Sequence, residues 1–122
     1  MGISINPDQF ADAWAKAWNA GDVEAVLAHF HDDVEFTSPL AAKVMPASNG
    51  TIRGKAALRD YWTTALSTRP GLRFEVLSLC TGVDILVINY RSEKGDLRAE
   101  LLRFRDGLVV EGHGTYAAGH DA

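Results

Sequence analysis

The chain has 122 residues, of which 47% are hydrophobic and 23% are charged, and its formal net charge is −4. This length and composition predict one globular domain over residues 1–122, and the acidic balance argues against a nucleic-acid partner. The single cysteine, Cys80, excludes an intramolecular disulfide. Because no apolar run reaches the roughly 18 residues of a membrane helix and the start does not resemble a signal peptide, we expect a cytoplasmic protein without a membrane partner.

The first two elements are predicted to be helices with recognisable starts and stops. Asn6 can cap a helix, Pro7 suits its first position, and Gln9 completes a capping box. An apolar stripe at helical spacing follows, formed by Phe10, Trp14, Ala17 and Trp18. Gly21 ends this helix, and Asp22 is placed to cap a second, short one. The apolar residues of that second helix are Val23, Val26, Leu27 and Phe30.

The stretch "HFHDDVEFTSPL" at 29–40 follows, where a helical pattern changes to alternating polarity typical of a cavity wall. Residues 40–54 contain Pro46 and Gly50, and they predict a loop with at most a short strand near 51–52. A third helix is predicted from 55 to 67, and "RPG" at 69–71 stops it. Its inward residues are expected to be Leu58, Tyr61, Trp62, Ala65 and Leu66.

The second half of the chain contains four strand-like runs at regular spacing, at 72–82, 84–93, 97–107 and 108–117. The segments "TGVD", "EKGD" and "RDG" between them indicate hairpin turns. Helices followed by a four-stranded antiparallel meander make an α+β domain. A curved sheet wrapped around the long helices would leave a cavity between the two layers.

This order of elements, with "WNAGD", "HDDVEFTSP", "IRGKAALRDYW" and "FRDGLVVEGHGTY" in place, resembles the nuclear-transport-factor-2-like superfamily. Within it, the chain is most similar to SnoaL-like and ketosteroid-isomerase-like proteins. The resemblance implies a cone-shaped, curved antiparallel sheet around three N-terminal helices, the cystatin-like or ketosteroid-isomerase-like fold, enclosing a pocket. It does not imply one activity, because these proteins include isomerases, cyclases, epoxide hydrolases, dehydratases and proteins without chemistry.

Three catalytic positions of ketosteroid isomerases can be placed on this sequence by the resemblance. Their aspartate base precedes the proline of a segment similar to "DDVEFTSP", and here that position is Ser38. Their oxyanion-hole tyrosine corresponds to Trp14, whose indole donates a hydrogen bond but cannot ionise. Their protonated aspartate corresponds to Glu100. The resemblance therefore implies that true ketosteroid isomerase activity is absent, with Glu100 as the catalytic candidate.

Strand alternation and the family pattern together predict which residues face the cavity. If Glu100 points inward, Leu102 and Phe104 do too, as do Leu86, Ile88 and Tyr90 on the preceding strand. On the last strand the inward set is Val110, Gly112, Gly114 and Tyr116, and the outer set is Glu111, His113 and Thr115. Missing side chains at the two glycines would enlarge the cavity. The expected ligand-binding residues are Trp14, Trp18, Phe36, Ser38, Trp62, Ile88, Tyr90, Leu102, Phe104, Gly112 and Tyr116.

Most of these candidates also have a simpler structural interpretation. Glu100 is either a buried acid with a raised pKa or a carboxylate on the outer face, paired with Arg98 or Arg103. Ser38 either binds a ligand or shapes the turn before Pro39. The aromatic side chains either line a ligand site or belong to a plain core.

Outside the expected cavity, three further groups are candidates for chemistry. The histidines of "HFHDD" stand two residues apart, wrong for one helical face, so we expect no metal site there. Cys80 is expected to be an inert buried thiol, and His113 either a base or part of a subunit contact.

Two functions fit this sequence. The first is an enzyme that uses Glu100 as general acid or base on a small apolar molecule, as an isomerase, cyclase or hydratase does. The second is a non-catalytic small-molecule-binding module or dimeric scaffold. Neither implies a cofactor. A homodimer is expected, because the outer sheet face carries an apolar patch formed by Ile85, Val87, Leu101 and Val109.

Overall fold

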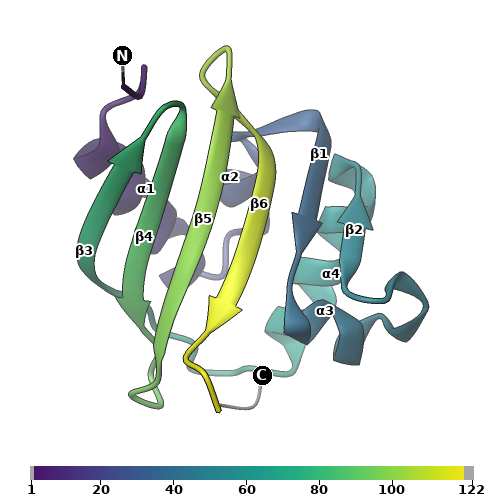
Figure 1. The fold of residues 1–122 in the computed structure, drawn as a ribbon. Coiled ribbons are helices and arrows are strands. Elements are labelled where there is room, and N and C mark those ends of the chain that lie inside the picture. The colour runs from purple at the N-terminus through teal and green to yellow at the C-terminus, as the bar shows by residue number, and fades with distance from the viewer. Residues whose placement is uncertain (1, 120–122) are drawn as a thin grey trace.

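Helices occupy most of the first half of the chain and strands most of the second half (Figure 1). The computed structural model describes residues 2–119. Its strands form one curved, unclosed sheet of six strands, and the helices pack against one face of that sheet (Figure 1). This α+β architecture agrees with the predicted fold class.

Helices α1 (Pro7–Asn19) and α2 (Val23–Leu27) begin as the capping pattern predicts. The side chain of Asn6 accepts a hydrogen bond from the backbone N–H of Gln9, and that of Asp22 accepts one from Ala25. Gly21 adopts a positive φ of 67° after α1, a conformation that suits glycine and ends the helix. The apolar stripe of α1 is buried, as its helical spacing predicts.

The segment between α2 and α4 contains more structure than its sequence predicts. Strand β1 (Phe30–Thr37) is followed by helix α3 (Pro39–Val44), the 3-10 turn η1 (Pro46–Ser48) and strand β2 (Thr51–Arg53). The prediction of a loop was therefore wrong at α3, whereas the short strand expected near 51–52 is confirmed as β2. The Ser38 side chain caps α3 by accepting a hydrogen bond from the Leu40 N–H, and the following proline suits the first helical position.

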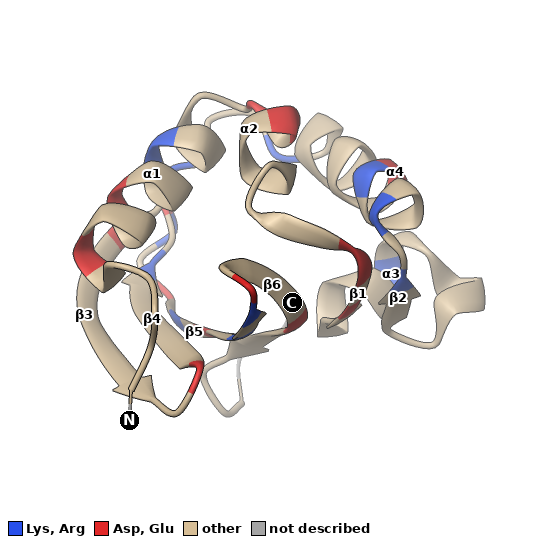
Figure 2. Cartoon of the chain, turned by 90° about the horizontal axis from the view of Figure 1, so that it is seen from above, with Lys and Arg blue, Asp and Glu red and all other residues tan. Residues whose placement is uncertain are grey.

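Helix α4 (Lys55–Ser67) has the predicted bounds. Its residues Leu58, Tyr61, Trp62 and Ala65 are buried, while Leu66 is half-buried. Viewed from above, α1, α2 and α4 form an arc over the curved sheet (Figure 2). Within residues 2–119, no helix combines the length and the apolar character needed to cross a membrane.

The four predicted strands β3 (Glu75–Gly82), β4 (Ile85–Arg91), β5 (Leu97–Arg105) and β6 (Leu108–Tyr116) form the expected antiparallel meander. The spatial order is β2-β1-β6-β5-β4-β3. Strand β1 pairs with β6 in parallel and with β2 antiparallel, so the sheet is mixed and wider than the meander alone. This parallel pair connects the first half of the chain to the last strand.

A β-bulge on β6 changes the predicted inward set. Arg103 pairs with Glu111 but Phe104 pairs with Val109, which leaves Val110 as the extra residue. Val109 is therefore fully buried, with 0% exposure, while Val110 is only half-buried. The predictions that Val110 faces inward with the glycines and that Val109 belongs to the outer patch were wrong. Beyond the bulge the predicted alternation holds.

A two-way hydrogen bond ties the end of α1 to the start of the meander. The Asn19 side chain donates to the Phe74 carbonyl oxygen at 3.0 Å and accepts from the Phe74 N–H at 2.7 Å. Phe74 is buried, and its ring stacks on Trp14 of α1 at 5.6 Å between centroids. These two hydrogen bonds hold the end of helix α1 over the face of the sheet where the cavity lies.

Candidate functional site

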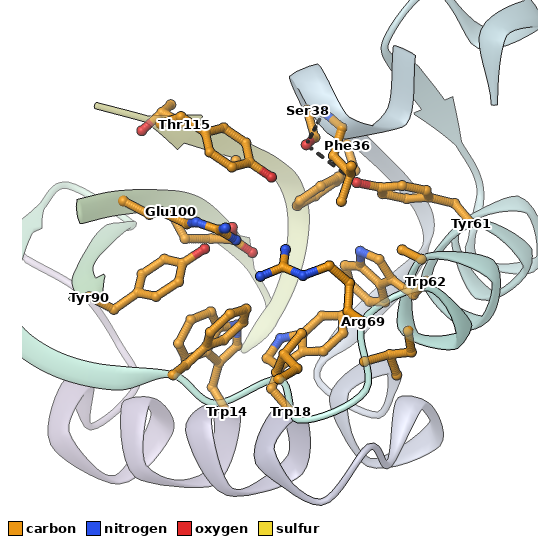
Figure 3. A pocket seen from close by; sticks show the side chains of 18 residues that line it. Trp14, Trp18, Phe36, Ser38, Tyr61, Trp62, Arg69, Tyr90, Glu100 and Thr115 are labelled. Atoms are coloured by element: carbon orange, nitrogen blue, oxygen red, sulfur yellow. Dashed lines mark hydrogen bonds between the residues drawn. The ribbon is translucent and has the colours of Figure 1, made fainter. Parts of the chain in front are cut away.

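A cavity lies between the helices and the inner face of the sheet (Figure 3). Its empty volume is about 560 Å³ including the space at its mouth. Side chains from α1, β1, α4, β4, β5 and β6 contribute to its wall, together with the segment that follows α4. The wall is mostly aromatic and aliphatic, with a small number of polar groups, as is typical of small-molecule sites.

Glu100 places a carboxyl group in this cavity. It lies on β5 with 5% of its surface exposed, opposite Ile88 on one side and Gly114 on the other. Of the two orientations considered from sequence, the inward one is observed. Burial raises the pKa of Glu100 from 4.5 to about 7, and the nearby charge of Arg98 offsets only part of this rise. Glu100 can therefore both hold and release a proton near neutral pH.

Two arginines line the same cavity, and each has its own carboxylate. Arg98 Nε lies 2.6 Å from Asp96 Oδ2, and Arg69 Nη2 lies 2.7 Å from Glu93 Oε2. Burial raises the pKa of Asp96, but hydrogen bonds from Ser92 and Arg98 outweigh it and bring the value down to about 2. Both arginine charges are thus balanced without Glu100. Among the described lining residues Glu100 is the only carboxyl group.

Ser38 has a structural role and also faces the cavity. Besides capping α3, its Oγ accepts a hydrogen bond from Tyr61 Oη at 3.3 Å. A Cβ atom built on Gly114 would lie 3.5 Å from both Ser38 Oγ and Glu100 Oε1, so these two groups flank that glycine. Burial raises the pKa values of Tyr61, Tyr90 and Tyr116 further above their ordinary value, so all three phenols are neutral hydrogen-bonding groups.

Trp14 and Trp18 lie on the same face of α1 and point their indoles toward the cavity (Figure 3). Both Nε1 atoms are buried, and within residues 2–119 neither has a hydrogen-bond partner. Aromatic neighbours fix the rings: Trp14 packs edge-on against Tyr90, and Trp18 against Trp62, each with centroids 5.0 Å apart.

The structure brings most of the sequence-predicted site residues together. The cavity wall includes Trp14, Trp18, Phe36, Ser38, Trp62, Tyr90, Glu100 and Tyr116. The remaining predicted residues lie in the packed interior, outside this wall; they are Ile88, Leu102, Phe104 and Gly112. At Gly112 the missing side chain makes room for the Phe36 ring, since a Cβ there would lie 2.7 Å from Phe36 Cδ1.

Four polar lining residues were not predicted as part of the site: Tyr61, Arg69, Arg98 and Thr115, the last of which was expected on the outer face. The signal for Arg98 was present, because it stands two residues before Glu100 and so shares its face of β5. Tyr61 is on the inward face of α4, as expected, but its helical spacing alone does not separate a cavity residue from a core residue. Arg69 follows the end of α4, and no periodic pattern predicts where such a residue points.

The outer sheet face carries a separate chain of hydrogen bonds. His113 Nδ1 lies 2.6 Å from Thr37 Oγ1, and His113 Nε2 lies 2.6 Å from Glu111 Oε2. Glu111 also accepts a hydrogen bond from Arg103 at 2.8 Å.

Cys80 is exposed, so the prediction of a buried thiol was wrong. It lies on β3 opposite Val87, on the outer face of the sheet. Across residues 2–119, no group of three or more potential metal ligands is found.

Comparisons with known proteins agree with this architecture. A sequence profile of the SnoaL-like domain matches residues 11–112. Among solved structures, a SnoaL-like protein of unknown function from Burkholderia thailandensis is 38% identical, with 92% of this chain and 94% of that chain covered and a TM-score of 0.85. Among curated proteins there is no significant match.

Two more distant structures share the fold. TerC, co-crystallised with polyporic acid, is 18% identical over 91% of both chains, with a TM-score of 0.74. A protein of ketosteroid-isomerase-like fold from Catenulispora acidiphila, in complex with trimethylamine, is 15% identical over 93% of this chain and 88% of that chain, with a TM-score of 0.72.

Proposed function

The chain belongs to the SnoaL-like family, and on that premise we propose that it binds a small, largely apolar molecule in the cavity and moves a proton on it through Glu100. The observation that carries the proposal is a single carboxyl group, 5% exposed, in a wall whose arginines are already paired. A general acid or base works best when its pKa lies near the working pH. The pKa of about 7 for Glu100 meets that condition.

The other lining residues would hold and orient the molecule. We assign apolar contact to Trp14, Trp18, Phe36 and Trp62, and orientation by hydroxyl groups to Ser38, Tyr90 and Tyr116. Two proteins of the same fold were crystallised with small organic molecules, polyporic acid and trimethylamine. They support the use of this cavity for a small ligand, although neither identifies the one bound here.

A compound screen tests this function. Small ring compounds that raise the melting temperature of the wild type are incubated with it, and products are sought by mass spectrometry. We expect Glu100→Gln to bind the same compounds but to lose turnover by about 100-fold or more, because it cannot exchange the proton. Glu35→Gln is the matched control, since that carboxylate is half-exposed and pairs with Arg53 at 3.8 Å. Full turnover by Glu100→Gln would contradict the assignment.

Binding without chemistry is the second candidate. It is favoured by Ser38, which stands where the resemblance places the isomerase base and whose Oγ already accepts from Leu40 and Tyr61. A serine without an adjacent base does not remove a carbon-bound proton near neutral pH. Tight binding of several screened compounds, with no product by mass spectrometry from any of them, would favour this function over the first.

We also propose that the chain forms a homodimer through the outer face of the sheet. Ile85, Val87 and Leu101 share that face and are only half-buried in the single chain, and no helix covers it (Figure 1). An apolar patch on an open sheet face usually marks an interface. In a two-fold contact, Arg103, Glu111 and His113 would lie at its rim.

Light scattering tests the assembly. The expected mass is twice the 13.3 kDa of one chain, and the double variant Val87→Lys/Leu101→Lys should return it to one chain. Thr63→Lys is the control, because Thr63 is exposed on α4, a helix that packs on the other face of the sheet. A monomeric wild type at micromolar concentration would contradict the dimer, and a dimer that survives the double variant would contradict the choice of face.

A further inference from the structure

Arg69 stands at the mouth of the cavity, and the proposed proton transfer does not use it. Most lining residues that keep some exposure belong to two segments, one around the end of α4 and one at the end of β6. They are Leu66, Arg69, Leu72, Gly114, Thr115 and Tyr116. The cavity therefore opens between these two segments. Among the described residues of this mouth, Arg69 is the only one with a charged side chain.

The guanidinium group of Arg69 points into the cavity. In Figure 3 it extends from the segment after α4 toward the wall that carries Tyr90 and Glu100. The side chain keeps 13% of its exposure. It is therefore held in place, yet a molecule that enters through the mouth can reach it.

The turn between β4 and β5 holds Arg69 in this position. Glu93 of that turn accepts a hydrogen bond from Arg69 Nη2 at 2.7 Å through Oε2, and one from the Arg73 backbone N–H at 3.1 Å through Oε1. Because its two oxygens serve two different donors, Glu93 uses one N–H of Arg69. A guanidinium group carries five such donors, and within residues 2–119 no second hydrogen bond of this side chain is found. Glu93 thus fixes Arg69 and leaves most of its donors for a ligand.

Arg98 lines the same cavity but is less accessible than Arg69. It is 9% exposed, and its Nε lies 2.6 Å from Asp96 Oδ2. Its guanidinium group also lies over the ring of Tyr116, 4.6 Å from the centroid. These contacts make Arg98 part of the packed wall, so Arg69 is the cation that an entering ligand meets first.

We propose that Arg69 anchors an acidic group of the ligand at the mouth, and that the ligand is a ring compound with a carboxylate at one end. The planar guanidinium group matches the two oxygens of a carboxylate. At the mouth the carboxylate keeps part of its hydration, whereas burial of a charge among the aromatic side chains deeper in the cavity would be costly. The ring then lies inside, on the side of Glu100. This inference rests on the proposed function, because it assigns a ligand class to the same cavity.

Pairs of compounds with nearly the same shape separate the charge from the ring. The probes are 2-naphthoate with 2-naphthamide and trans-cinnamate with cinnamamide, measured by calorimetry at pH 6. We expect the wild type to bind each carboxylate about 10-fold more tightly than its amide, because hydrogen bonds between charged groups are the stronger ones. Arg69→Gln should remove this preference, and Arg69→Lys should keep part of it. Arg53→Gln is the matched control: it removes the same charge from a side chain that is 72% exposed on β2, and it should keep the full preference.

A second measurement works on the wild type, so it does not depend on how well the variants fold. Salt screens an ion pair at the mouth of a cavity, so raising the NaCl concentration from about 50 mM to about 500 mM should weaken carboxylate binding by about 3-fold and leave amide binding unchanged. Equal affinity for carboxylate and amide, or a preference that survives Arg69→Gln, would overturn the anchor and leave the cavity as a small-molecule site. If none of the four compounds bound, both the anchor and the proposed function would be overturned.

Discussion

Replacing Glu100 by glutamine should change how the stability of the protein depends on pH. In the wild type the carboxyl is 5% exposed and burial raises its pKa from 4.5 to about 7. The folded state therefore holds a proton that the unfolded chain releases between these two values. Stability falls with pH wherever the folded state binds more protons than the unfolded one. The wild type should accordingly lose stability as pH rises from 4.5 to 7, and the loss should level off above 7.

The size of this effect follows from the shift itself. Each unit of pKa difference corresponds to roughly 1.4 kcal/mol. The difference between 4.5 and about 7 then gives a loss of about 3 kcal/mol in the free energy of unfolding across that range. Glutamine has nearly the same shape and does not titrate in this range. The Glu100→Gln variant should not lose this stability as pH rises. The difference in the free energy of unfolding, variant minus wild type, should therefore increase by about 3 kcal/mol between pH 4.5 and pH 8.

Urea unfolding followed by tryptophan fluorescence, repeated at half-unit steps from pH 4.5 to pH 8, measures this difference. The quantity to compare is how the difference in the free energy of unfolding between variant and wild type changes with pH, because glutamine also shifts stability by an amount that does not depend on pH. Glu35→Gln removes one formal charge at a half-exposed position and controls for overall charge. A gap that stays constant over the whole range would refute the reasoning, since it would mean that Glu100 titrates alike in the folded and unfolded chains.

Three further substitutions test the packing around the cavity, each by urea unfolding at pH 7. Gly112→Ala would put a Cβ 2.7 Å from Phe36 Cδ1 and should cost about 1–3 kcal/mol; an unchanged midpoint would show that the ring moves aside freely. Asn19→Ala removes both hydrogen bonds to Phe74 and should cost about 1–3 kcal/mol, and a neutral result would mean that packing alone holds this junction. Ser38→Ala removes a helix cap and should cost about 1 kcal/mol, which Ser38→Thr should largely restore if the cap is the cause.

The helices that could be predicted from sequence are those whose signals are local. Helices α1 and α4 have the expected bounds because an apolar stripe and adjacent stop residues define each of them. Helix α3 also had a local signal, Ser38 followed by Pro39, but Pro46 and Gly50 close behind it favoured a loop. A short helix of six residues contributes too little periodicity to outweigh such residues.

The sheet and the cavity depend on contacts that local pattern does not contain. The alternation on β5 predicted that Glu100, Leu102 and Phe104 share one face, but it left open whether that face was the inner one. On β6, the bulge at Val110 shifted the start of the strand by one residue. The parallel pairing of β1 with β6 follows from tertiary structure alone. For the same reason Arg69, which lies between a helix end and a strand, could not be assigned to the cavity before the fold was known.

The pairing of β1 with β6 also has a consequence for how the chain is made. Thr37 and His113 form one contact of this pair, and they stand 76 residues apart in the sequence. During synthesis, β1 therefore cannot pair with β6 until the end of the chain has been made. The apolar faces of α1 and α4 are synthesised before the sheet that covers them is complete. Contacts between such distant residues form slowly, since a long loop must close first. A nascent chain that ends before β6 would hold β1–β2 and β3–β5 as two separate pieces of sheet, each with an open edge.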